Sequence, residues 1–207
     1  MKNTTNQFAW IVFVVLAVAI GLYPLTYFFA DREFGLLASK SEELLSNTLW
    51  NVGFYGHILF GGLALLIGWV QFSKKLRNAN LGRHRTIGKV YIISAIISGI
   101  CGIYIGIYAT GGIVSSLGFI SLGIVWLYTT LKAYFAIRKG DVQLHQGFMI
   151  YSYAACFAAV TLRIWLPLLG YVFGDFVTAY RIVAWLCWVP NIIVAFFWVR
   201  KRGLLLG

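Results

Sequence analysis

The sequence is poor in charged residues, and above all in acidic ones. Only 11% of its 207 residues are charged, and 6 Asp and Glu stand against 17 Lys and Arg, which gives a formal net charge of +11. Soluble domains carry about 25% charged residues, so this chain has too little polar surface to cover a water-soluble globule. With 60% hydrophobic residues it is also far too apolar for a disordered chain. The composition therefore indicates an integral membrane protein.

Cysteines are few, and carboxylates are missing from the hydrophobic runs. Cys101, Cys156 and Cys187 form no CxxC pair and lie inside apolar stretches, so we expect small buried side chains and no disulfide or thiolate metal site. HExxH, P-loop and GxSxG motifs are absent. A metal-dependent hydrolase is disfavoured because it would lack a general base, apart from Asp141 in a loop.

Six predominantly apolar runs are long enough to cross a bilayer, which takes about 20 residues. They are Phe8–Phe29, Trp50–Phe72, Val90–Ala109, Ser115–Ile137, Gly147–Tyr171 and Tyr180–Val199. Because the connections are short, we expect a single domain over residues 1–207, an all-α bundle of six transmembrane helices. Ser39 and Glu42 fit a capping box, so we also expect a short amphipathic helix at about residues 40–48. Pro190 and Asn191 predict a kink in the last span.

The basic residues gather in the connections at one end of these spans. The segment SKKLRNANLGRHRTIGK between the second and third spans holds six of them, and others follow the fourth and sixth spans. By the positive-inside rule both termini are predicted to be cytoplasmic. The positive charge is then mainly a topology signal that also attracts anionic lipid headgroups, and we expect no nucleic-acid partner.

Ionisable residues at membrane depth are few, and such residues are functional candidates by default. His57 lies about two turns, roughly 10 Å, below the outer end of the second span, and Arg163 lies equally far below the outer end of the fifth. We expect the two to meet in the outer leaflet. The alternative is a purely structural Arg163 that bonds to backbone carbonyls or to His57. At the inner face, His84 and His145 are expected to converge.

Three spans carry stripes of small and polar residues at helical spacing. The stripes are His57, Gly61, Ala64, Gly68 and Gln71; His84, Gly88, Tyr91, Ala95, Ser98 and Gly102; and His145, Met149, Ser152, Cys156, Ala159 and Arg163. Small residues allow close helix packing, but they would equally leave room for a flat cofactor. We therefore expect the second, third and fifth spans to face one another, with the fourth completing a four-helix core.

Three segments resemble a bacterial family of predicted membrane proteins, domain of unknown function 2306. They are GHILFGGLALLIGWVQF, GRHRTIGKVY and HQGFMIYSYAACFAAVTLRIWLP, and the similarity runs from about His57 to Pro167. Gln146 and Tyr151 stand where the family pattern has basic residues, which weakens an anion-binding role on that side. The resemblance implies a bacterial inner-membrane protein and names no activity.

At the level of fold the sequence also resembles four-helix b-type membrane cytochromes, in which histidines on facing helices hold haem iron. Three histidines allow at most one bis-histidine haem b, and Gln71 stands where a further histidine would lie. The resemblance implies haem ligation by His84 and His145, with Arg83 or Arg85 near the propionates. His57, Arg163 and Gln71 would then form a separate ligand site, for a quinone headgroup or a carboxylate.

Three functions stay open at this point. The first is a redox protein that holds one haem b or exchanges electrons with quinone. The second is a protein that binds or transports a small anionic or lipidic ligand through Arg163 and His57. The third is a non-catalytic accessory subunit of a larger membrane complex. Whether the protein is an enzyme is not decided by these residues.

Overall fold

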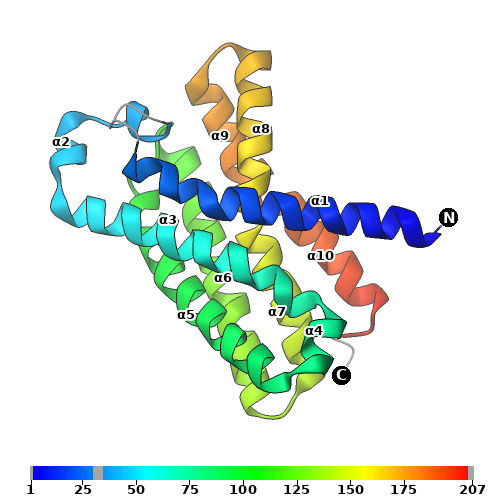
Figure 1. Cartoon of the computed structure of the whole chain (residues 1–207). Coiled ribbons are helices and arrows are strands. Elements are labelled where there is room, and N and C mark those ends of the chain that lie inside the picture. The colour runs from blue at the N-terminus through cyan, green and yellow to red at the C-terminus, as the bar shows by residue number, and fades with distance from the viewer. Residues whose placement is uncertain (1, 30–34, 205–207) are drawn as a thin grey trace.

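The computed structural model describes residues 2–29 and 35–204, and within them the chain is all-helical (Figure 1). The helices that cross the bundle are α1 (Lys2–Leu22), α3 (Thr48–Gly68), α5 (Leu81–Gly106), α6 (Ile113–Arg138), α7 (Val142–Cys156), α8 (Ala158–Phe173), α9 (Phe176–Leu186) and α10 (Val189–Lys201). Short elements are the 3-10 turns η1 (Tyr23–Phe28), η2 (Leu37–Ser39) and η3 (Trp69–Phe72), with α2 (Glu42–Ser46) and α4 (Lys74–Ala79). Six helical stretches are long and apolar enough to cross a membrane, because α7 with α8 and α9 with α10 each form one span. The predicted fold class is confirmed.

Spans two to five form the core. Helix α3 packs along α5, α5 along α6 and α6 along α7, while α7 also touches α3. Helix α1 crosses the outside of α3, α9 packs on α6, and α10 packs on α7 (Figure 1). The ring of neighbours places α5 and α7 at opposite corners. The four-helix core expected from the stripes is therefore present.

Glycines bring α3 and α5 into close contact. A Cβ atom on Gly53 would lie 2.8 Å from the Tyr104 ring, and one on Gly61 would lie 2.9 Å from Ser98 Oγ. Small residues at such crossings let helix backbones approach, which is how membrane helices gain packing energy without a hydrophobic driving force. Close helix packing thus accounts for Gly53, which lies outside the predicted stripe, and for Gly61, which belongs to it.

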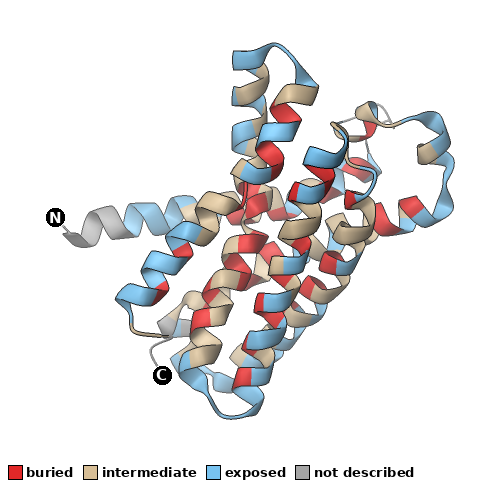
Figure 2. Ribbon diagram, turned by 180° about the vertical axis from the view of Figure 1, so that it is seen from behind, coloured by how far each residue is buried: buried red, intermediate tan, exposed pale blue. Residues whose placement is uncertain are grey.

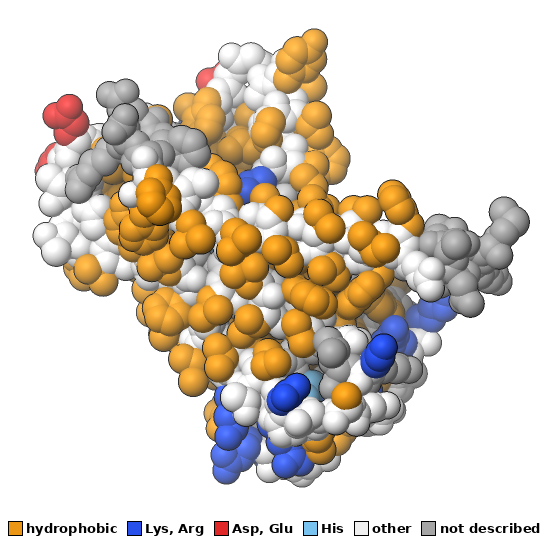
Figure 3. All heavy atoms as spheres, in the orientation of Figure 1, with side chains coloured by type: hydrophobic (Ala, Val, Ile, Leu, Met, Phe, Trp, Pro, Cys, Tyr) orange, Lys and Arg blue, Asp and Glu red, His pale blue; other side chains and the backbone are white. Residues whose placement is uncertain are grey.

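The two ends of the bundle differ in charge. One end of the bundle, which we call the terminal end, comprises α4, the 139–141 turn and the end of α10, and most Lys and Arg side chains gather there. The acidic side chains visible in Figure 3 lie at the opposite end, beside α2 and on the α8–α9 hairpin. This second end, the α2 end, also holds the 107–112 turn and the tight connection from Gly174 to Asp175. This unequal distribution of Lys and Arg is the basis for the prediction that both termini are cytoplasmic.

Several boundaries differ from the prediction because polar side chains start helices earlier or later than hydrophobicity indicates. Asn80 caps α5 by accepting a hydrogen bond from Arg83 N, so the basic segment is helical and His84 lies inside the helix. Ser41, and not Ser39, caps α2, which is shorter than the predicted 40–48 segment. Ser39 Oγ instead lies 3.0 Å from Thr110 Oγ1.

The last two spans are each interrupted near mid-length. α7 ends at Cys156 and α8 begins at Ala158, and α9 ends at Leu186 before α10 begins at Val189. The predicted kink in the last span is found beside Pro190, but the break in the fifth span has no Pro or Gly signal. The α8–α9 hairpin projects from the core at the α2 end, with much exposed surface (Figure 2).

Candidate functional site

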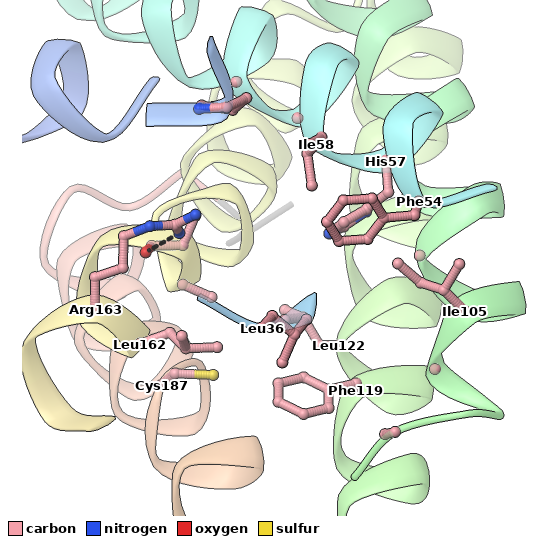
Figure 4. A pocket seen from close by; sticks show the side chains of 18 of the residues that line it. Leu36, Phe54, His57, Ile58, Ile105, Phe119, Leu122, Leu162, Arg163 and Cys187 are labelled. Carbon is pink, nitrogen blue, oxygen red and sulfur yellow. Dashed lines mark hydrogen bonds between the residues drawn. The ribbon is translucent and has the colours of Figure 1, made fainter. Parts of the chain in front are cut away.

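A cavity of about 640 Å³ lies between the α2 end of the core and the α8–α9 hairpin. Its walls come from α1, η1, α3, α5, α6, α8 and α9, and most are apolar (Figure 4). The ionisable side chains along it are Tyr23, Tyr27, Lys40, His57, Cys156, Arg163, Tyr180 and Cys187. No carboxylate belongs to the lining within the described part of the chain. A concave, mostly apolar site with a few polar groups has the form of a small-molecule binding pocket.

Arg163 supplies the cation of this cavity. Its position on α8 directs the side chain inward from the wall opposite His57 (Figure 4). Nη1 donates a 2.9 Å hydrogen bond to the Ala159 carbonyl oxygen, and the guanidinium carbon lies 4.3 Å from the centre of the Tyr23 ring. Nε is buried and has no hydrogen-bond partner among the described residues. The structural bond to a backbone carbonyl is thus present, yet it leaves the positive charge without a counterion in the described structure.

His57 is held on the opposite wall by the α3–α5 contact. Its Nδ1 lies 3.0 Å from the Ser98 carbonyl oxygen and 3.2 Å from Ser98 Oγ, and Gly102 leaves space for the ring. Donation from Nδ1 to the carbonyl fixes the tautomer in which Nε2 is the acceptor. Nε2 is then available to a ligand, since no described residue bonds to it. His57 and Arg163 share the cavity, as expected, but do not bond to each other.

Lys40 ties down the segment over the α2 end of the cavity. Its Nζ donates to the Tyr108 carbonyl oxygen at 2.6 Å and to Thr110 Oγ1 at 3.0 Å. Partial burial lowers the pKa of Lys40 to about 8, because the charged amine is poorly solvated there. Sequence analysis did not select Lys40, Tyr23 or Tyr27. The only feature of the sequence that could have pointed to Tyr23 and Tyr27 is that they are tyrosines within an otherwise apolar first span.

Below the cavity the interior is filled. Trp126 lines the cavity floor, and its Nε1 donates to Tyr91 OH at 3.4 Å. Tyr91 OH lies 2.8 Å from Ser152 Oγ, which lies 2.7 Å from Thr130 Oγ1. Tyr153 OH donates to the Leu65 carbonyl oxygen at 2.9 Å. These side chains are buried, and their hydrogen bonds join α3, α5, α6 and α7 at the level where a flat cofactor could have lain.

His84 and His145 lie near each other at the terminal end, close enough for their charges to interact. His145 Nδ1 lies 2.9 Å from the Ala133 carbonyl oxygen, an arrangement common for metal-ligating histidines. Arg83 and Arg85 are exposed, and Arg85 is among the charges that act on His84. The described residues contain no cluster of three or more His, Cys, Asp or Glu side chains.

A haem between His84 and His145 stays a prediction, and the packing next to these histidines bears on it. A macrocycle extending from these rings into the bilayer would occupy the space between α5 and α7. Tyr91, which is fully buried, crosses that space and bonds to Ser152. At this level the space between α5 and α7 is used by side chains, whereas stripe residues nearer the α2 end, among them Gly61, Gly102 and Ala159, line the cavity.

Gln71 is separated from the cavity. It lies in η3, 14 residues after His57, or roughly 20 Å along a helix. Its side chain is 9% exposed, and both amide atoms lack partners among the described residues. The residues selected from the sequence therefore form two groups, His57 with Arg163 and His84 with His145, and Gln71 does not line the same cavity as His57.

The chain was compared with protein-family models, curated proteins and solved structures. The model described as "Predicted membrane protein (DUF2306)" matches residues 54–199, which include both histidine groups and most of the cavity wall. No curated protein and no solved structure matches the chain. Because the family model covers well over half of the sequence, this chain belongs to the DUF2306 family of predicted membrane proteins.

Proposed function

We propose that this integral membrane protein binds an amphiphilic anion, with the ligand's headgroup at Arg163 and its apolar part along the cavity. The observation that carries the proposal is the guanidinium of Arg163, which faces a cavity that has no carboxylate among its described lining. A charge inside a membrane protein is costly unless it is paired, so such residues commonly mark ligand or ion sites. An anion would supply the counterion that the described lining does not provide.

The other groups of the cavity suit the same ligand. His57 Nε2 faces Arg163 across the cavity and offers a hydrogen-bonding nitrogen (Figure 4). The remaining wall is built from aliphatic and aromatic side chains such as Ile58, Leu122 and Leu162, which suit an alkyl or prenyl chain. A volume of about 640 Å³ lies in the usual range of small-molecule pockets, roughly 300–1,000 Å³.

The test is a thermal shift of the full chain in lipid nanodiscs with dodecanoate, against dodecan-1-ol as the uncharged probe. Dodecanoate should raise Tm, by the equivalent of about 2.7 kcal/mol at a hundredfold excess over Kd, and the alcohol should not. Arg163→Leu should abolish the shift. The matched control is Arg138→Leu, which removes an exposed arginine at the terminal end and should keep it. An equal shift in Arg163→Leu and wild type would refute the proposal.

A second candidate is a redox protein with one haem b, and the proximity of His84 and His145 favours it. It predicts a Soret band in purified protein that is lost in His145→Ala. The hydrogen-bonded layer of Tyr91 and Ser152 argues against it. Colourless protein purified from haem-replete cells would eliminate this candidate.

We also infer a setting for the protein. The Lys and Arg side chains at the terminal end support cytoplasmic termini and a cavity in the outer leaflet, and the family resemblance supports a bacterial inner membrane. Cysteine labelling at Lys139 and Val172 with a membrane-impermeant maleimide tests this orientation. Only Val172→Cys should react in intact cells. An accessory role with a partner subunit would instead require stable co-purification of a second protein.

A further inference from the structure

The cavity has two borders through which a ligand could enter, one at the α2 end and one on the membrane-facing side. The first border is the 35–40 segment, which crosses over the cavity. Leu36 packs against the α9 cluster around Tyr180 on one side and against the cluster of Trp50 and Phe54 on the other. The segment therefore bridges opposite walls in the manner of a roof.

Hydrogen bonds fasten this roof to its surroundings. Lys40 Nζ donates to the Tyr108 carbonyl oxygen and to Thr110 Oγ1, which also lies 3.0 Å from Ser39 Oγ. At the other side Leu36 N donates to Tyr27 OH at 3.4 Å. The described part of the roof is thus tied at both ends to the bundle, so the path towards the aqueous phase is obstructed.

The second border is the seam where α1 and η1 meet α8. Both sides of this seam line the cavity, with Ile20 and Tyr23 on one side and Arg163 and Leu166 on the other. Its lower limit is the stack of Phe13 on Phe157, with ring centres 5.0 Å apart. Above that stack the helices meet where the Arg163 guanidinium lies on the Tyr23 ring.

The seam opens on a surface that is otherwise apolar. Figure 3 shows basic side-chain atoms in the notch between α1 and the α8–α9 hairpin, surrounded by hydrophobic side chains. Exposed flanking residues include Leu22 and Leu25 before the notch and Ile164 and Leu168 on α8. Arg163 is neither fully buried nor exposed, and it lines the cavity beside this notch. Its position ten residues before the end of α8 places it roughly 15 Å along the helix from the Gly174 turn.

The geometry points to lateral entry: the ligand is a membrane-dissolved single-chain amphiphilic anion that passes from the bilayer between η1 and α8, with Arg163 at the threshold. The inference rests on the proposed function and adds the source of the ligand. An anionic headgroup sliding along the seam meets the guanidinium before the cavity, while the alkyl chain stays in contact with apolar side chains throughout. For a water-soluble anion, the described part of the roof and its hydrogen bonds lie across the route from the α2 end.

The access route can be measured without any ligand. A nitroxide at the cavity-lining position Leu162, introduced as Leu162→Cys in a chain whose three native cysteines are alanine, reports collisions with oxygen, which is concentrated in lipid, and with nickel-EDDA, which stays in water. We expect high oxygen and low nickel accessibility in nanodiscs. Lys40→Ala, which unfastens the roof, should raise nickel accessibility. Two control labels give the limits of collision accessibility: Ala133, buried in α6, for an inaccessible site, and Val172, exposed at the hairpin tip, for an accessible one.

High nickel accessibility of the Leu162 label with the roof intact would overturn lateral entry. Should the Leu162 variant not give monodisperse protein, the same measurement at Ile58, on the opposite wall, decides the question. Palmitate added to the nanodisc should immobilise the label, and butyrate in the aqueous phase should not. If accessibility indicates a lipid-facing opening but palmitate leaves the label mobile, the proposed function fails while the access route stands.

Discussion

The two halves of the bundle differ in how their interiors are packed. We call the half towards the terminal end the filled half and the half towards the α2 end, which contains the cavity, the hollow half. Towards the terminal end, Tyr91, Thr130 and Ser152 form a fully buried layer whose hydroxyl groups bond to one another. Towards the α2 end, Arg163 and His57 face each other across empty space, and Arg163 keeps an unpartnered Nε among the described residues. Trp126 belongs to both, as the floor of the cavity and a donor to the layer. The comparison separates residues that hold the fold from those available to a ligand.

The largest expected difference between the halves is in how a Gly→Ala substitution, which adds one methyl group, changes the free energy of unfolding. Gly68→Ala would place a Cβ atom 2.3 Å from the Tyr153 ring in the filled half, and we expect a loss of about 1–3 kcal/mol because the ring is packed on all sides. Gly170→Ala on α8 meets nothing within 4 Å and should gain up to about 1 kcal/mol from helix propensity. Thermal unfolding in one detergent measures both variants. Similar Tm values for the two would remove the distinction.

Replacing a polar side chain should also change stability differently in the two halves, and we expect a smaller difference than for the glycines. Ser152→Ala leaves Tyr91 OH and Thr130 Oγ1 without their shared partner and should cost about 1–3 kcal/mol. Arg163→Leu removes a charge without a described counterion, so its stability should equal or exceed that of wild type even though the contact with Tyr23 is lost. Chemical denaturation in mixed micelles compares them. A strongly destabilised Arg163→Leu would show that the arginine is structural.

The smallest expected effect is a shift in the pH at which Lys40, in the roof over the cavity, loses its proton. Lys40 has a pKa lowered to about 8 by burial, so the folded protein releases this proton well below the ordinary lysine range. Only the neutral amine reacts with acylating reagents. Labelling of Lys40 should therefore rise through about pH 8 in folded protein, and only nearer pH 10 after denaturation. Mass spectrometry of the Lys40 peptide gives both midpoints, and identical midpoints would show that the amine is fully solvated.

The sequence predicts the filled half better than the hollow one. The small-residue stripes place α3, α5 and α7 in one core because close packing depends on residue size and helical period, which are local properties. The same stripes do not reveal whether the space between helices is filled, since Tyr91 reaching Ser152 depends on the separation of α5 and α7. His57 and Arg163 stand out as ionisable residues in apolar runs. Tyr23 under Arg163 does not, because its role requires η1 to lie against α8.

The break in the fifth span illustrates the same limit. No Pro or Gly lies between Cys156 and Ala158, but a side chain from the next span contacts the backbone there. Asn191 Nδ2 donates to the Ala154 carbonyl oxygen at 3.3 Å, and inserted side chains of this kind accompany breaks in helices. A contact between residues 37 positions apart leaves no periodic signal in the sequence around Ala154.

This asparagine has a consequence for the way the protein is made. Asn191 also donates to the Cys187 carbonyl oxygen at 3.0 Å and to Thr161 Oγ1 at 3.1 Å, and Thr161 Oγ1 donates to the same carbonyl. The Cys187 carbonyl can accept from Asn191 within the sixth span alone, whereas the bonds of Asn191 to the Ala154 carbonyl and to Thr161 form only when the fifth and sixth spans lie together. During synthesis the fifth span would wait beside the insertion machinery until residue 191 has emerged. The last two spans would therefore enter the bilayer as a pair, and the wall that carries Arg163 would be the last part of the protein to form.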